Sequence, residues 1–140
     1  MDRLTSAQHR LAAAIDLPGL LDAAYDAFED MLGILRHQQD DESAFPAFVM
    51  AAAAAANGRD WIAGVEGLPS VASRDRDGDL SADTTAADVA KAVAALSREV
   101  AARLTAVAAS TRSAGDRQYC ERAAAEAVAI TTLLGGANSP

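Results

Sequence analysis

The sequence holds few of the residues from which catalytic and metal sites are usually built. Its 140 residues include one cysteine, Cys120, and two histidines, His9 and His37, and only 4% are aromatic. A single cysteine cannot form a disulfide within the chain, which fits a reducing compartment. Metal sites inside helical bundles use Glu-x-x-His pairs, and neither histidine belongs to one. We therefore expect no metal ion and no cofactor, and we assign no catalytic residue.

Signatures of phosphate binding and of membrane insertion are also missing. The chain has no Gly-x-Gly-x-x-Gly pattern and no Gly-Lys-Ser/Thr. No apolar run reaches the roughly 20 residues that span a bilayer, and polar residues follow Met1 where a signal peptide would be apolar. The net charge of −8 disfavours binding to nucleic acid or to an anionic membrane, because both need a positively charged surface. We expect a cytoplasmic protein with neither partner.

What the sequence does contain is helical periodicity. The alternation of apolar and polar residues that marks a half-buried strand is absent, whereas apolar residues recur three and four positions apart. The expected helices span residues 5–15, 17–38, 44–57, 84–112 and 116–134. The sequence therefore predicts one all-α domain over residues 1–140, an up-and-down four-helix bundle with an additional short N-terminal helix.

Two polar segments lie outside these helices. Residues 71–83 are expected to form a loop between two helical hairpins, and residues 135–140 a flexible tail. Within the loop, residues 75–83 resemble the start of an EF-hand calcium loop, with acidic residues at the first, third, fifth and ninth positions. Leu80 then stands where the sharp turn needs glycine, and Ala86 stands where a bidentate glutamate is needed. These departures argue against a calcium site.

The helix expected over residues 17–38 has the clearest division between an apolar and an acidic side. Its acidic side carries Asp22, Asp26, Glu29 and Asp30, nearly opposite an apolar stripe. Carboxylates four residues apart can share a cation, but surface exposure is their usual state. We expect a solvated acidic face here. Cys120, by contrast, falls on the apolar side of the last helix and is expected in the core.

The stretch from Phe45 to Gly58 is the most unusual part of the sequence, because it has no polar residue before Asn57. A helix that is apolar all round belongs in a protein core or in a subunit interface. About a quarter of the chain is alanine, which buries little area, so the neighbouring helices offer limited cover. We expect a non-enzymatic helical bundle that self-associates, as a dimer, through this helix. The candidate interface residues are Phe45, Phe48, Val49, Ala52, Ala53 and Ala56.

A second hypothesis places a small molecule, or an enzyme's substrate, in an apolar pocket between the helices. Bundles build such sites between facing helices, and aromatic residues beside small ones leave room for a ligand. Filling the core is the commoner role of such residues, so this hypothesis ranks second. The candidate pocket residues are Tyr25, Phe28, Phe48, Met50 and Trp61.

Overall fold

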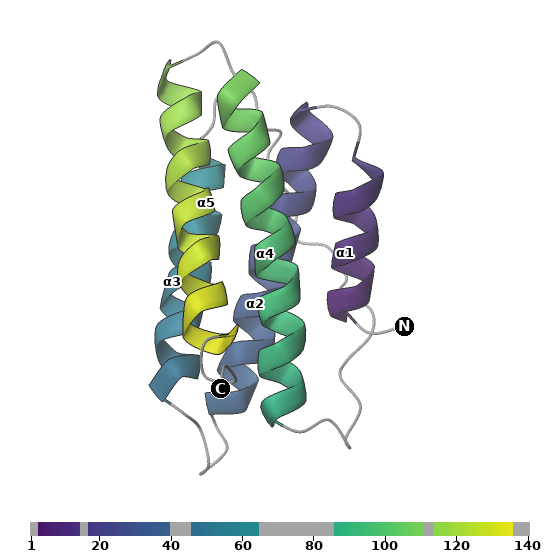
Figure 1. Ribbon diagram of the computed structural model, residues 1–140, viewed down its shortest axis with the longest axis vertical. Coiled ribbons are helices and arrows are strands. Elements are labelled where there is room, and N and C mark those ends of the chain that lie inside the picture. Colours follow the sequence, from purple (N-terminus) through teal and green to yellow (C-terminus); the bar gives the residue numbers. More distant parts are fainter. Residues whose placement is uncertain (1–2, 15–16, 40–45, 65–85, 111–113, 136–140) are drawn as a thin grey trace.

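The part of the chain that the structure describes is all-helical. The computed structural model describes residues 3–14, 17–39, 46–64, 86–110 and 114–135, and within them no strand occurs. The five described helices pack together (Figure 1) and confirm the all-α part of the predicted fold. They are α1 (Arg3–Ala13), α2 (Leu17–Gln39), α3 (Pro46–Ala63), α4 (Ala86–Ser110) and α5 (Ala114–Gly135). The predicted loop 71–83 and residues 136–140 of the predicted tail lie outside the described residues, whereas Gly135 is the last residue of α5.

The described helices pack around a common core, to which each of them contributes buried residues. Helix α3 packs against α2 and α5, and α5 packs against α3 and α4. Contacts between α2 and α4 are sparser, and α1 lies against both of these helices. The core is built from one or two faces of each helix, and its largest fully buried side chains include Phe28, Phe48, Leu11, Met31, Leu35, Ile62, Leu96, Leu104, Ile130 and Leu134.

The direction of the helices differs from a simple alternation. Trp61 at the end of α3 contacts Tyr119 at the start of α5, so these two helices run antiparallel. Gly135 at the end of α5 lies beside Ala94 in α4, so α4 and α5 are antiparallel as well. It follows that α3 and α4, which are consecutive in the chain, point the same way (Figure 1). A strict up-and-down order, in which each helix reverses the one before it, is not what these contacts show.

Helix α3 continues past the stop that its sequence suggests. The sequence predicts a helix over residues 44–57, but α3 extends to Ala63, and Gly58 is buried within it. A Cβ atom at Gly58 would lie 2.5 Å from Cζ of Phe28, closer than side-chain atoms can approach. Glycine is therefore required here by the close approach of an α2 ring, and not by a helix terminus.

Candidate functional site

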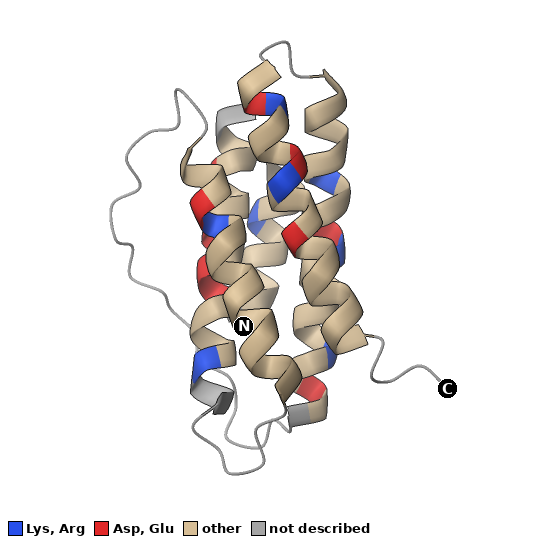
Figure 2. Ribbon diagram, turned by 90° about the vertical axis from the view of Figure 1, so that its left-hand side faces the viewer, with Lys and Arg blue, Asp and Glu red and all other residues tan. Residues whose placement is uncertain are grey.

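Two of the three large apolar side chains that are exposed among the described residues lie on the outer face of α3. Val49 is 53% exposed and Met50 is 59% exposed, and Ala53 and Ala56 continue the same face as exposed and half-buried residues. We call these four residues the outer stripe of α3. No charged residue occurs in α3 before Arg59, and Figure 2 shows long uncharged stretches of ribbon between the charged positions. Among described residues, one other large apolar side chain is comparably exposed, Val128 on α5 at 52%.

The structure divides the predicted self-association residues between two sides of α3. Phe48 and Ala52 point into the core, at 2% and 5% exposure. Val49, Ala53 and Ala56 belong to the outer stripe, and Phe45 lies outside the described residues. Met50 is missing from the predicted set although its side chain is 59% exposed. No sequence signal could assign it, because an apolar helix does not reveal which of its faces meets water.

Polar groups mark the C-terminal end of the outer stripe. Asn57 and Asp60 are exposed, and Arg59 reaches back towards α2. The Arg59 guanidinium lies 3.6 Å from Glu29 and 3.3 Å from Asp60, so it links the two carboxylates. Burial and the nearby Glu29 raise the pKa of Tyr25 on the same side of α2. The outer stripe therefore lies between an apolar end of α3 at Pro46 and a charged end at Asp60.

The residues predicted to line a pocket differ in burial and in their position along the helices. Phe28 and Phe48 are buried in the core, and Met50 points outwards from the outer stripe. Trp61 lies at the far end of α3, where its ring centroid is 6.0 Å from that of Tyr119 and 4.9 Å from the Arg122 guanidinium. Offset aromatic contacts and a cation over the indole ring stabilise this end of the α3–α5 pair. The aromatic residues thus hold helices together.

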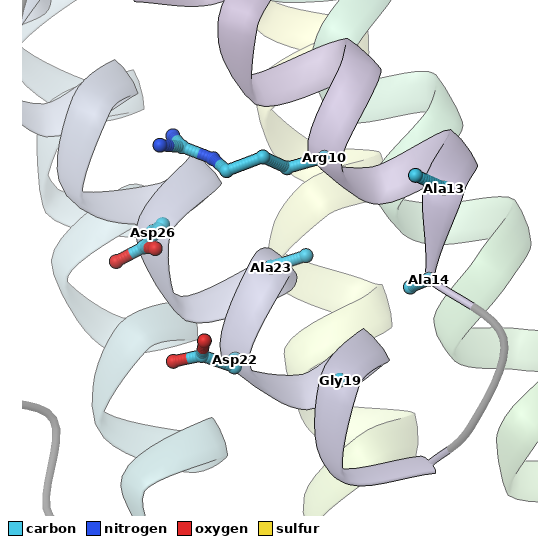
Figure 3. A pocket seen from close by; sticks show the side chains of 7 residues that line it. All are labelled: Arg10, Ala13, Ala14, Gly19, Asp22, Ala23 and Asp26. Atoms are coloured by element: carbon cyan, nitrogen blue, oxygen red, sulfur yellow. The ribbon is translucent and has the colours of Figure 1, made fainter.

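A hollow of about 230 Å³ lies between α1 and α2 (Figure 3). Alanine and glycine form much of its wall, Arg10 approaches from α1, and Asp22 and Asp26 line it from α2. The prediction of a solvated acidic face on α2 is wrong for Asp26 and Asp30, which are 1% and 0% exposed. The reason is tertiary: α1 folds back over that side of α2 and removes it from water.

Two polar contacts hold α1 in this position. Arg10 Nη2 donates to Asp30 Oδ2 at 3.0 Å, and Arg103 Nη2 on α4 donates to the backbone carbonyl of Ala14 at 2.8 Å. In an uninterrupted helix that carbonyl would accept the amide hydrogen of residue 18, which is proline and has none. Arg103 therefore satisfies a carbonyl that the local sequence leaves open, and ties the end of α1 to α4.

Cys120 is buried in the core, as its position in the sequence predicts. Burial raises the pKa of the thiol, and Asp116 and Glu121 raise it further. A raised pKa keeps the sulfur protonated, whereas nucleophilic cysteines need the thiolate. This cysteine has the surroundings of a packing residue.

Comparisons with protein-family models, with curated proteins and with solved structures found no match to this chain. Within the described helices, no three side chains among His, Cys, Asp and Glu are grouped so that they could hold a metal ion. None of the described helices is long and apolar enough to cross a membrane. The predicted start of a calcium loop, residues 75–83, lies outside the described residues.

Proposed function

We propose that the protein is a non-enzymatic helical module that forms a homodimer through the outer stripe of α3. The observation that carries the proposal is the side-by-side exposure of Val49 and Met50 on an uncharged helix face. Exposed apolar side chains that are grouped, rather than scattered singly, mark interaction surfaces. Ala53 and Ala56 complete the stripe with small side chains, which allow a second helix to approach closely.

The charge of the chain favours this face for contact between copies. Each copy carries a net charge of −8, so two copies repel each other over most of their surfaces. The stripe lies on the part of α3 from Pro46 to Gly58, which has no charged residue. Two negatively charged molecules can approach there at the smallest electrostatic cost.

The polarity of the stripe selects an antiparallel arrangement of the two α3 helices. A two-fold interface brings the same surface of both copies together. In a parallel pair, the exposed Asp60 of each copy would lie near that of the other. An antiparallel pair places Asp60 beside the uncharged Pro46 end of its partner and lets Met50 meet Ala56. Because the stripe is short, we expect a small interface and a dissociation constant of micromolar order.

The architecture and cellular location belong to the same proposal. We propose that α2 to α5 form a four-helix bundle with α1 as an additional short helix. Support comes from the packing of these four helices around shared buried residues. A cytoplasmic location is proposed because one buried, reduced cysteine suits a reducing compartment.

Sedimentation equilibrium on the full chain tests the dimer. The wild type should change with concentration from a 14.4 kDa monomer to a species of about twice that mass. Met50→Lys should keep it monomeric, because each copy would have to bury an ammonium group at the interface. Val128→Lys is the matched control, since Val128 is comparably exposed but lies on α5. A wild type that stays monomeric, or equal weakening by both variants, would reject the proposal.

The hollow between α1 and α2 favours a second candidate function, the binding of a small molecule. Its walls combine Asp22 and Asp26 with the Arg10 guanidinium, so a ligand with an amine and a second polar group would suit it best. A thermal-shift screen of amines and amino acids is the test. Stabilisation that is lost in Asp22→Asn would support this function, and no stabilisation by any compound would reject it.

A further inference from the structure

Helix α1 occupies a groove that the rest of the chain leaves open. Its apolar face buries Leu4, Ala7 and Leu11, at 3%, 0% and 0% exposure, between α2 and α4. Helices α2 and α4 pack less closely against each other than α2 packs against α3 or α4 packs against α5. The groove therefore exists as a binding surface for one amphipathic helix, in the manner of a helix seated between two others.

The contacts that hold α1 are complementary in charge as well as in shape. Arg10 is basic and half-exposed, with 43% of its side chain accessible, whereas its partner Asp30 is buried on α2. The Arg103 guanidinium supplies the second contact, to the carbonyl of Ala14. Both contacts join α1 to residues far away in the chain. A second copy of α1 could make both of them equally well.

The connection between α1 and α2 is the point at which exchange becomes possible. Helix α1 ends at Ala13 and α2 begins at Leu17, so three residues join two helices that pack against each other. Short connections between packed elements favour exchange of the terminal element between copies, since opening relieves the tight connection. Pro18 prevents the amide bonding that would fuse α1 and α2 into one regular helix.

We propose that the groove between α2 and α4 is a docking surface for α1 of a second copy, so that two copies can exchange their first helices. The exchanged dimer preserves every α1 contact of the monomer, and its formation does not depend on the outer stripe of α3. In the wild type, the α1 tethered to the same chain competes at an effective concentration of roughly millimolar order. Exchange is therefore rare at low protein concentration, and its measurement needs variants in which docking within the same chain is weakened.

Charge-reversed variants of the full chain meet this need. All of them also carry Met50→Lys, which removes the outer stripe of α3 as a contact between copies. One population carries Arg10→Asp and the other carries Asp30→Arg. Each alone places like charges between its own α1 and α2. When the two are mixed, exchange pairs opposite charges at both grooves. Native mass spectrometry should therefore show the heterodimer as the main dimer. It is identified by a mass that lies between those of the two homodimers.

A single chain that carries both reversals is the control. It should remain a folded monomer, since its own α1 again meets an opposite charge at position 30. If this control folds and the mixture gives no heterodimer, the proposal is overturned. If the control does not fold, hydrogen exchange of the wild type decides. Amides of α1 should then exchange faster than those of α4 and α5, whereas equal rates would show that α1 opens only with the whole protein and would overturn the proposal.

Discussion

Helices α2 and α3 reverse the roles that their sequences suggest. Helix α3 has no polar residue over its first three turns, yet one of its faces exposes Val49 and Met50. Helix α2 carries four carboxylates, yet Asp26 and Asp30 are buried. This difference in burial follows from the number of neighbouring helices. Helix α2 packs against α1, α3 and α4, whereas α3 packs against α2 and α5. Burial in this protein follows the count of packed neighbours more closely than the polarity of the helix itself.

The comparison is tested most severely by truncating one large side chain in each helix. Phe28→Ala in α2 should lower the free energy of unfolding by about 3–5 kcal/mol, because it removes a fully buried ring and leaves a cavity against Gly58. Met50→Ala in α3 should change it by no more than about 0.5 kcal/mol, as for other exposed positions. Urea unfolding of the two variants at low protein concentration measures both values. Similar losses in both would mean that α3 is as enclosed as α2.

Within α3, two adjacent alanines distinguish its faces. Ala54 is 6% exposed and Ala53 is exposed. Ala54→Leu should cost about 1–3 kcal/mol, because the added atoms overpack a tight contact between helices. Ala53→Leu should leave monomer stability unchanged and alter only the dimer, since its side chain would point outwards from the stripe. Thermal unfolding monitored by circular dichroism gives the first result, and sedimentation gives the second. Equal melting temperatures for both variants would contradict the assignment of faces.

The smallest expected effect concerns a carboxylate outside α2. Burial raises the pKa of Glu126 above its ordinary value of 4.5. The folded protein therefore holds this proton more tightly than the unfolded chain. The resulting stability is fully present below the unfolded pKa and is lost as the pH rises through the folded pKa. Glu126→Gln should thus be more stable than the wild type at pH 7, by no more than about 0.5 kcal/mol because the group is only partly buried.

Melting temperatures from pH 3 to 8 provide the measurement for Glu126, with Glu121→Gln as the control on an exposed position of the same helix. The difference between Glu126→Gln and the wild type should vanish at acidic pH, where the wild-type carboxyl is protonated in both states. A difference that is independent of pH would show that the amide acts through packing and not through its missing charge.

Local periodicity was sufficient to predict the five helices and much of the core. In α4, residues Val89, Val93, Leu96, Val100 and Leu104 are buried at the expected spacing, and in α5 so are Cys120, Ala123, Ala127, Ile130 and Leu134. These predictions succeed because a one-sided apolar stripe has only one way to face a core.

Predictions failed where a distant element decided the outcome. The burial of Asp30 depends on Arg10 and on the docking of α1, and the continuation of α3 through Gly58 depends on the Phe28 ring. Neither partner is near in sequence. The outer stripe could not be oriented for a related reason: with alanine at six successive positions, 51 to 56, every face of α3 is equally apolar. Only its neighbours determine which side remains exposed.

Methionine oxidation compares α2 and α3 within one molecule and tests the central claim, that the outer stripe faces water in the monomer and a second copy in the dimer. Met31 on α2 is 0% exposed, and Met50 on α3 is 59% exposed. In dilute protein, hydrogen peroxide should convert Met50 to the sulfoxide much faster than Met31. As the protein concentration rises, Met50 should become protected while Met31 stays unchanged. A Met50 rate that equals that of Met31, or that does not depend on concentration, would contradict the account.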